Sequence, residues 1–343
     1  MKAVVIEAPH DVVYRDVEAP TCGPDDVLVR SRCAGVCRTD VEMATGEFVD
    51  PRWVRFPCIP GHEWSGTIAE IGVNVTDLAL GKRVVCEGAI TCGSCPRCRS
   101  GDTQFCERSE QIGFTSGGGY GELVRVPRRL VHSLPDAVSF EAATLIEPAS
   151  VVLQGLLRAQ LLPGEAVGVI GVGTLGSLTL RLARLYSPRT IVAYGIRPEE
   201  LELARRLGAD DTVLVDRADA ELRADGAFGE LDLVVETAGA VSALQLAARL
   251  PRAGGRALLL GIAGEGKTVE LPADWIAMNG VALIGSISYT SAAWSRVVDL
   301  VRAGLVDFQP IVTHRFRARE FEQAFRLMNN REGVVGKVVL EHR

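Results

Sequence analysis

The segment that most constrains how this chain can fold is residues 166–185, AVGVIGVGTLGSLTLRLARL. Its apolar start predicts a buried strand, and the amphipathic run that ends it predicts a helix. Between the two, Gly171, Gly173 and Gly176 form the pattern G-x-G-x-x-G. The pattern alone has little specificity, and an ordinary glycine-rich turn is the alternative. Its place between a predicted strand and a predicted helix favours a dinucleotide-binding turn.

Each of these glycines has a physical role in such a turn. Gly171 permits the tight turn, and Gly173 lets the backbone approach a pyrophosphate, whose charge the N-terminus of the helix favours. Gly176 allows the helix to pack closely on the sheet. We expect cofactor contacts from the turn and from two later predicted strands, at Gly171, Val172, Gly173, Thr174, Leu175, Gly176, Ala238 and Gly261.

Around this turn the chain alternates short apolar runs with helical patterns, as repeated βαβ units do. The strands are expected at residues 166–171, 190–195, 231–239, 255–262 and 281–286. The region before Ala149 differs, because Gly, Pro and Asp separate short β-rich runs there. A length of 343 residues fits two domains. The prediction is an α/β chain with a small β-barrel-like domain followed by a doubly wound parallel sheet.

Four cysteines lie within fifteen residues of the first region, with the spacing C-x2-C-x2-C-x7-C. Four thiolates on a short loop fill the tetrahedral shell of a structural zinc. Disulfides are disfavoured because the chain has nine cysteines, an odd number, and its N-terminus lacks an apolar signal core. An iron–sulfur cluster is the other alternative. We expect zinc, in a protein of the reducing cytoplasm, held by Cys92, Cys95, Cys98 and Cys106.

Two shorter motifs precede the cysteine loop and contain further metal ligands. They are CRTD at residues 37–40 and GHE at residues 61–63. Cysteine, histidine and glutamate all bind zinc, and a catalytic zinc keeps one position open for water or substrate. Taken singly, the cysteine could be a small buried residue and the His-Glu pair a surface one. The four-cysteine loop and the nucleotide-binding turn that follow them favour a second, catalytic zinc.

With these motifs in order, the chain resembles the zinc-dependent medium-chain dehydrogenases/reductases, the superfamily of alcohol, polyol and threonine dehydrogenases. The resemblance covers essentially the whole length, through CRTD, GHE, the cysteine loop, IEPAS, GVGTLG and a terminal GKVVL. It implies a GroES-like β-barrel catalytic domain at 1–148 and 288–343, with the structural zinc lobe. It also implies a Rossmann NAD(P)-binding domain at 149–287.

The resemblance assigns roles to individual side chains. Cys37 and His62 match the family's ligands of the catalytic zinc. Glu63 matches a glutamate that is a ligand in some members and lies behind the ligands in others. Glu147, in IEPAS, matches a further ligand position, and we expect it to bind zinc directly or through water. Asp40 would orient His62 by a hydrogen bond. The expected content is therefore about two zinc ions per chain.

The resemblance implies hydride transfer between an alcohol carbon and the nicotinamide, with zinc lowering the pKa of the alcohol. Thr39 matches the family hydroxyl that relays the proton. Many members carry a histidine three residues further on, whereas this chain has Glu42. Two interpretations stay open: Glu42 is the terminal base of the relay, or it is simply exposed and the proton leaves by another path.

The predicted second strand of the nucleotide-binding domain bears on cofactor choice. An NAD site places Asp or Glu about 20 residues after the glycines. This strand ends instead in Gly195, Ile196 and Arg197. The glycine leaves room for a 2′-phosphate, which Arg197 could pair through its guanidinium group. We expect NADP(H) to be preferred over NAD(H), the alternative being that Arg197 is a surface residue.

The sequence constrains the substrate less than it constrains the fold, the metals or the cofactor. IEPAS and GHEWSG are more typical of the polyol, threonine and cyclitol branch, and GHEWSG with IGFT resembles 2-deoxy-scyllo-inosamine dehydrogenases. A secondary alcohol of a polyol, sugar or aminocyclitol, with its ketone, is the first expectation. A simple secondary alcohol or aldehyde is the second. By analogy Phe48, Trp53, Phe114 and Thr115 line the pocket, although such aromatics are more often core.

Composition excludes some other classes. The net charge of −6 provides no general basic field, which argues against a nucleic-acid partner. Glycines interrupt the uncharged stretches, which fall short of the ~20 apolar residues of a membrane span. A non-catalytic binding protein on the same fold is disfavoured because Cys37, Thr39, His62 and Glu147 are retained. Family members are usually dimers or tetramers, and we expect copies to pair at VALIGS, residues 281–286.

Overall fold

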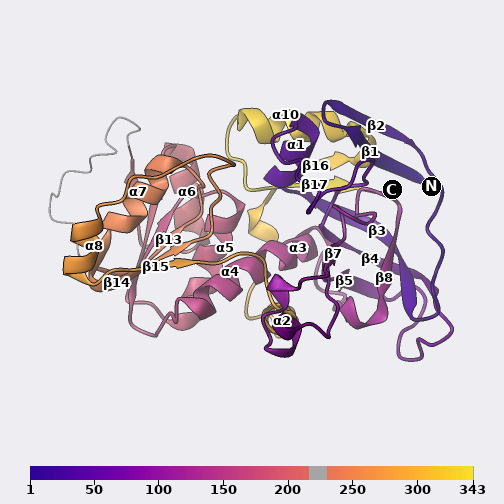
Figure 1. Cartoon of the computed structure of the whole chain (residues 1–343), viewed down its shortest axis with the longest axis horizontal. Helices are drawn as coiled ribbons and strands as arrows, with labels where there is room; N and C mark the ends of the chain where they lie inside the picture. The colour runs from indigo at the N-terminus through magenta and orange to yellow at the C-terminus, as the bar shows by residue number, and fades with distance from the viewer. Residues whose placement is uncertain (216–229, 343) are drawn as a thin grey trace. The chain divides into compact units, whose positions relative to one another are not determined.

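The computed structural model describes residues 1–215 and 230–342 (Figure 1). The chain forms two compact units. The first unit comprises Met1–Glu147 and Thr290–Arg343, and the second comprises Pro148–Tyr289. None of the described helices has the length and apolar character needed to cross a membrane.

The first unit is built on a mixed sheet to which both ends of the chain contribute. Its strand order is β16-β17-β3-β4-β5-β9, and β8 pairs with β3 beside this path. The C-terminal strand β17 lies antiparallel to β3, with Val338 opposite Val36 and Glu341 opposite Cys33. The strands are β3 Asp26–Val36, β4 Glu63–Ile71, β5 Arg83–Cys86, β8 Leu123–Pro127, β9 Val131–Ser133, β16 Val312–Arg317 and β17 Lys337–Glu341.

Two hairpin-like pairs complete the strands of this unit. β1 (Lys2–Ala8) pairs with β2 (Asp11–Asp16), and β6 (Ala89–Ile90) pairs with β7 (Glu110–Gln111). The second pair closes the base of the four-cysteine loop, so residues between 91 and 109 project as a lobe. Inside the lobe are the short helices α2 (Pro96–Arg99) and η1 (Thr103–Phe105).

Helix α1 (Arg38–Thr45) starts where β3 ends, because Cys37 adopts extended dihedral angles and caps it. Asp40 accepts the backbone N–H of Cys37 at 2.9 Å, as a capping-box acid does. Gly46 ends the helix at φ +80°, a left-handed conformation that favours glycine. The other helices here are α3 Phe140–Thr144, α9 Ser291–Arg302, α10 Phe321–Asn330, η2 Arg128–Leu130, η4 Gln309–Ile311 and η5 Ala318–Glu320, and α4 Ile146–Arg158 begins in this unit.

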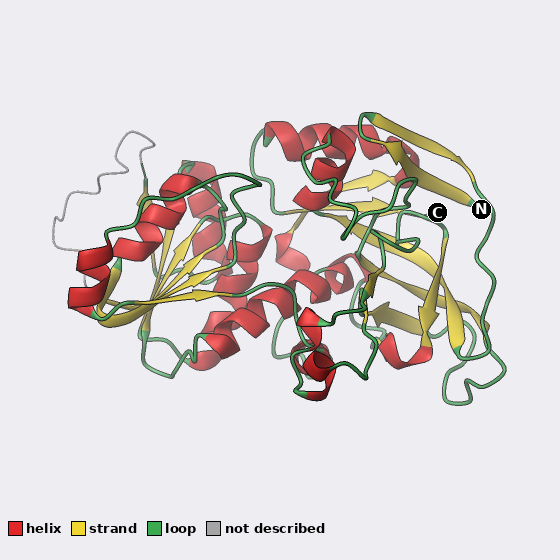
Figure 2. Ribbon diagram, viewed as in Figure 1, coloured by secondary structure: helices red, strands yellow, loops and turns green. Residues whose placement is uncertain are grey.

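The second unit is a parallel sheet in the order β12-β11-β10-β13-β14-β15, with helices on both faces (Figure 2). Its first strand, β10, is central and the order reverses beside it, which is the Rossmann arrangement. The sheet consists of β10 Ala166–Ile170, β11 Thr190–Gly195, β12 Asp211–Leu214, β13 Leu231–Glu236, β14 Pro251–Leu259 and β15 Ala282–Gly285. The helices are α5 Thr174–Ala183, η3 Arg184–Tyr186, α6 Pro198–Leu207, α7 Val241–Arg249 and α8 Ala273–Asn279.

Candidate metal centres and cofactor site

Three potential zinc ligands of the first unit meet where β3 ends and β4 begins. The ligand atoms of Cys37, His62 and Glu63 all lie within 4.8 Å of one another. The antiparallel register places Gly35, near the end of β3, opposite Glu63, which opens β4. Neighbouring antiparallel strands therefore bring the CRTD and GHE motifs together. His62 and Glu63 are buried, with 7% and 2% of their surface exposed.

The electric field of this cluster favours a cation. Burial alone would lower the pKa of His62, but the Cys37 thiolate and the Asp40 carboxylate raise that pKa well above its ordinary value. Asp40 Oδ1 and His62 Nδ1 lie 3.6 Å apart, and neither has a hydrogen-bond partner among the described residues. A buried set of sulfur, nitrogen and oxygen donors in such a field fits a zinc ion.

One buried cation already belongs to this cluster. Lys337, at the start of β17, forms an ion pair with Glu63, and its side chain is 1% exposed. Burial would lower the pKa of Lys337, but the charges of Glu63 and Cys37 raise it. A side chain at Gly35 would overlap both partners, Glu63 Oε2 and Lys337 Cε. The pair therefore requires glycine on the strand between them.

The other residues expected at the catalytic zinc differ in how closely they approach the cluster. Glu147 is 7% exposed, and burial, followed by the charges of Glu63 and Asp40, raises its pKa to about 7. It lies outside the group of ligand atoms within 4.8 Å. The Thr39 hydroxyl is 3.8 Å from the Cys37 sulfur. Glu42 accepts a hydrogen bond from Arg38 at 3.2 Å, and its side chain is 31% exposed.

The four cysteines of the lobe form the second cluster, again with all ligand atoms within 4.8 Å of one another. Backbone N–H groups point at the sulfurs, for example from Cys95 to Cys92 at 3.4 Å and from Cys98 to Cys95 at 3.5 Å. Such donors stabilise thiolates, and they lower the pKa of Cys92 to about 5. All nine cysteines, which lie in the described part of the chain, are free thiols. This arrangement suits a closed four-thiolate site.

The glycine-rich turn of the second unit joins β10 to α5. Gly171 has φ +89°, and a Cβ there would lie 2.9 Å from Ala238 Cβ. A Cβ on Gly176 would overlap the carbonyl oxygen of Gly171. A Cβ on Gly173, which caps α5, would meet nothing within 4 Å. Two of the glycines are thus required by close packing, whereas the third leaves open space at the helix N-terminus.

The end of β11 carries the residues expected to select the cofactor. Gly195 closes the strand, and Arg197 precedes α6. Arg197 Nη1 lies 3.9 Å from Glu200 Oε1, and the two side chains are 27% and 9% exposed. A phosphate bound here would therefore have to share the Arg197 guanidinium group with the Glu200 carboxylate.

Comparison with known proteins decides the family. The family described as "Alcohol dehydrogenase GroES-like domain" matches residues 23–136, and "Zinc-binding dehydrogenase" matches residues 174–303. An L-threonine 3-dehydrogenase of Rhizobium etli is 33% identical over 349 aligned positions, covering 99% of this chain and 98% of that protein. The chain belongs to the zinc-type medium-chain dehydrogenase/reductase family. The predictions of family and of fold class are confirmed.

Two further proteins are similar to this medium-chain dehydrogenase over nearly its whole length. The sorbitol dehydrogenase of Bacillus subtilis is 28% identical, covering 94% of this chain and 92% of that one. A crystal structure from Sinorhizobium meliloti, described as a zinc-binding dehydrogenase bound to NADP, is 30% identical with a TM-score of 0.91. It covers 99% of both chains.

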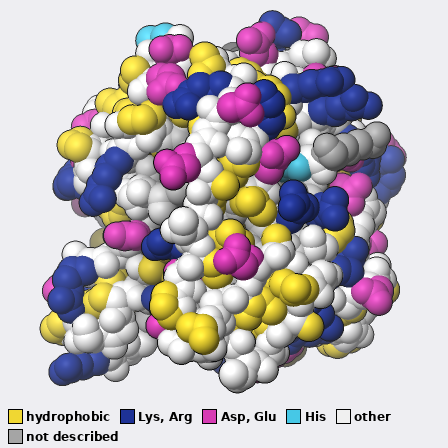
Figure 3. Space-filling model, turned by 90° about the vertical axis from the view of Figure 1, so that its right-hand side faces the viewer, with side chains coloured by type: hydrophobic (Ala, Val, Ile, Leu, Met, Phe, Trp, Pro, Cys, Tyr) yellow, Lys and Arg dark blue, Asp and Glu magenta, His cyan; other side chains and the backbone are white. Residues whose placement is uncertain are grey.

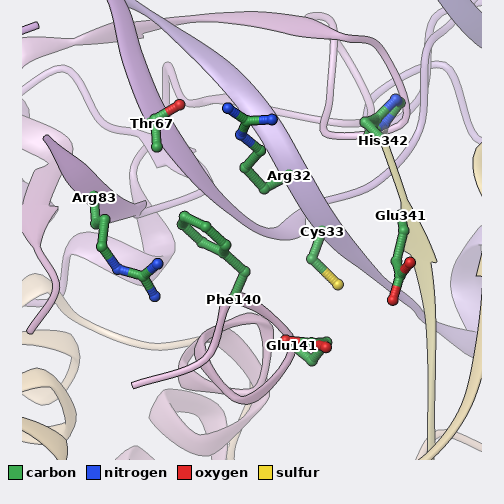
Figure 4. Close-up of a pocket in the computed structure, with 8 residues that line it drawn as sticks. All are labelled: Arg32, Cys33, Thr67, Arg83, Phe140, Glu141, Glu341 and His342. Atoms are coloured by element: carbon green, nitrogen blue, oxygen red, sulfur yellow. The ribbon is translucent and has the colours of Figure 1, made fainter. Parts of the chain in front are cut away.

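The first unit of this dehydrogenase also has a hollow of about 370 Å³ apart from the metal cluster (Figure 4). Arg83 lies at its edge with its guanidinium carbon 3.9 Å from the centroid of the Phe140 ring. Glu141 accepts a hydrogen bond from Arg315 at 3.4 Å. Burial raises the pKa of the Cys33 thiol well above its ordinary value, which leaves it unreactive. We assign no chemistry to this hollow.

Three buried polar residues of this dehydrogenase belong to no motif that the sequence displays. Lys337 is a single cation in the apolar run GKVVL, and that isolation is its only signal. Glu236, at the end of β13, accepts the N–H groups of Ala238 and Gly239 at 2.7 and 2.8 Å and so shapes the loop beside the glycine turn. Tyr120 stands among glycines in GGGYG, and its hydroxyl donates to Asp40 at 2.9 Å.

Proposed function

We propose that this enzyme interconverts a secondary alcohol of the polyol, sugar or aminocyclitol type with its ketone, and prefers NADP(H) to NAD(H). The proposal depends above all on the cluster of half-buried Cys37 with buried His62 and Glu63 in a chain of this family. Relatives named for threonine and for sorbitol both act on substrates with a secondary hydroxyl group, which supports the substrate class.

Cys37, His62 and Glu63 would hold the catalytic zinc, with Glu147 as a further ligand or a partner through water. The field that raises the pKa of His62 supports this assignment, because it stabilises positive charge at the same place. A second, structural zinc would be held in the lobe by Cys92, Cys95, Cys98 and Cys106. We therefore propose about two zinc ions per chain.

When bound, zinc activates the alcohol oxygen and the nicotinamide accepts the hydride. Among the chain's own groups, we propose that Thr39 takes the substrate hydroxyl proton, and the 3.8 Å between its hydroxyl and the Cys37 sulfur supports this role. Asp40 orients His62 from behind. Glu42 is held in an ion pair with Arg38, so we propose that the proton passes from Thr39 to water and not to Glu42.

The open space at Gly173 supports binding of a pyrophosphate at the N-terminus of α5. Val172, Thr174 and Leu175 of the turn, and Ala238 and Gly261 at the neighbouring strand ends, would complete the cofactor site. The preference for NADP(H) rests on the missing carboxylate at Gly195 and on Arg197. The NADP bound to the Sinorhizobium meliloti relative supports it.

Replacing Arg197 by alanine tests this preference. Because a phosphate loses its guanidinium partner, kcat/KM with NADP should fall about tenfold or more, a loss typical of a charge-assisted hydrogen bond. The value with NAD should change little. Arg206→Ala, at an exposed arginine of helix α6, which follows Arg197, is the matched control. An equal fall with both cofactors, or wild-type preference for NAD, contradicts the assignment.

Aromatic residues form an apolar wall at the metal cluster. The Phe114 ring centroid lies 4.8 Å from that of His62, and Phe48 meets Phe114 edge-on at 6.2 Å. Thr115 is engaged by the backbone N–H of Gln111 at 2.8 Å, and Trp53 is 53% exposed. This wall favours the second candidate function, oxidation of a simple secondary alcohol or reduction of an aldehyde, for which apolar contact suffices.

A screen at the nicotinamide absorbance separates these functions. Polyols, sugars, aminocyclitols and simple secondary alcohols are each offered with NADP and with NAD. We expect the highest kcat/KM with a polyhydroxylated substrate and NADP. Best turnover of a simple alcohol would replace the first candidate by the second. No turnover of any secondary alcohol or carbonyl would leave only a non-catalytic binding protein.

We propose a cytoplasmic homo-oligomer, a dimer or tetramer, without nucleic-acid or membrane partners. The nine free thiols suit a reducing compartment. Acidic and basic side chains alternate over the face shown in Figure 3 instead of forming one basic field. The free side of β15 and the exposed side chains near it, Leu283, Ile287 and Met278, support pairing of copies there.

A further inference from the structure

Tyr120 joins the two chain segments that carry Cys37 and His62. It is fully buried. Its ring packs against the backbone before His62, since a Cβ on Gly61 would lie 2.9 Å from Tyr120 Cε1. Its hydroxyl donates to Asp40 Oδ2 at 2.9 Å, and Gly35 O lies 3.4 Å away. A phenylalanine would satisfy the packing equally well, so the hydroxyl requires a separate explanation.

The hydroxyl fixes the direction in which the Asp40 carboxylate points. Asp40 Oδ2 accepts two hydrogen bonds of 2.9 Å, one from the Cys37 N–H and one from Tyr120. Two donors on one oxygen prevent the carboxylate from rotating freely. The other oxygen, Oδ1, then faces His62 Nδ1 at 3.6 Å.

We propose that Tyr120 is a positioning residue for the catalytic zinc. Its hydroxyl fixes Asp40, whose Oδ1 faces His62 Nδ1 at 3.6 Å. The fixed carboxylate orients the imidazole electrostatically, so that the remaining ring nitrogen stays aimed at the space shared with Cys37 and Glu63. This inference rests on the proposed function of that cluster. It adds a third layer to the site, because the Tyr120 hydroxyl donates to Asp40, which in turn faces His62.

Tyr120→Phe removes the hydroxyl and keeps the ring. Residues that orient metal ligands typically change metal affinity by 10- to 100-fold, and we expect about tenfold weaker zinc binding at the Cys37 site. Competition with a chelator measures this affinity on the full-length protein. The four-cysteine site is an internal control whose affinity should not change. Tyr194→Phe, at a buried tyrosine of β11 in the second unit, is the matched control and should retain both affinities.

Absorption spectra of the cobalt-substituted protein provide a readout that a purely structural role would not move. With Tyr120→Phe, the ligand-field bands of cobalt at the Cys37 site should shift, because His62 is held less firmly. Thermal unfolding is recorded alongside. A lower melting temperature with unchanged cobalt bands and unchanged zinc affinity would show that Tyr120 is only a core residue, and would overturn the inference.

A double-mutant cycle with Asp40→Asn shows whether the effect passes through Asp40. If it does, Tyr120→Phe should weaken zinc binding about tenfold in the wild type and less than twofold in the Asp40→Asn background. Equal effects in both backgrounds overturn the inference. Wild-type protein that binds only the lobe zinc would instead refute the proposed function, so the two failures are distinguishable.

Discussion

Lys337 is the buried cation that balances the negative charge beside the proposed zinc ligands Cys37, His62 and Glu63. Negative charge is brought into this space by Cys37, Asp40 and Glu63. Lys337, which is fully buried, supplies the compensating positive charge. A buried carboxylate that loses its partner is strongly destabilising, because the protein interior solvates charge poorly. Lys337 therefore supplies the positive partner of the buried Glu63 carboxylate.

Lys337→Met tests this role. Methionine has a similar volume to lysine but no charge, so Glu63 is left buried without its partner. We expect the free energy of unfolding of the zinc-free protein, in which no metal compensates Glu63, to fall by about 3 kcal/mol or more. Urea unfolding followed by circular dichroism measures it. Lys2→Met, which removes an exposed ion pair with Asp16, is the control and should leave unfolding unchanged. Equal effects of the two variants would contradict the account.

At the scale of the element, Asp232 ties together three strands of the second unit. Its Oδ2 accepts the N–H of Ala166, which opens β10, at 2.8 Å. Its Oδ1 accepts from Arg252 of β14 at 2.7 Å. Burial would raise the pKa of Asp232, but these partners hold it below its ordinary value of 3.8. A lowered pKa means that the folded state favours the ionised carboxylate.

Linkage fixes the sign of the pH dependence. Because the folded pKa is lowered, the contribution of Asp232 is complete above the ordinary value of 3.8 and is lost as pH falls through the folded pKa. Asp232→Asn should therefore reduce the free energy of unfolding at pH 7 and have a progressively smaller effect below pH 3.8. Urea unfolding across this range measures the difference. A difference that grows toward acid would contradict the assignment.

The strands of the second unit show what the sequence could predict. The alternation after Glu165 predicted β10, β11, β13, β14 and β15, because buried parallel strands are continuous apolar runs. It did not predict β12 (Asp211–Leu214), whose residues are exposed or half-buried at the edge of the sheet and lack such a run.

The residues of the proposed metal site also differ in whether the sequence could predict them. Cys37 and His62 carry motif signals, so their pairing could be expected from the sequence. Lys337 and Tyr120 are distant in the chain and reach the cluster only through the pairing of β17 with β3 and the packing on Gly61. No local pattern encodes such tertiary contacts.

In the whole molecule, β15 pairs along one edge only among the described strands. It lies at the end of the sheet order, and its burial pattern is largely exposed. An unpaired edge with exposed apolar side chains is a template for pairing with a second copy. A two-fold axis through this edge would place the same residues of both copies against each other.

Leu283→Lys tests this assembly. Leu283 is 37% exposed on β15, and two lysines brought together across a two-fold axis would repel each other. We expect sedimentation velocity to show an oligomer for the wild type and a smaller species for the variant. Leu305→Lys, at a 62% exposed leucine of the first unit, is the control. An oligomer that survives Leu283→Lys would place the interface elsewhere.

The claim that the Cys37 cluster holds the catalytic zinc is tested most directly by the zinc content of Cys37→Ala. Cys58→Ala, at a buried thiol whose pKa burial raises to about 12, is the matched control. Elemental analysis should find about two zinc ions per chain in the wild type and in the control, and about one in Cys37→Ala, as expected when one of two sites is lost. Two zinc ions retained by Cys37→Ala would contradict the account.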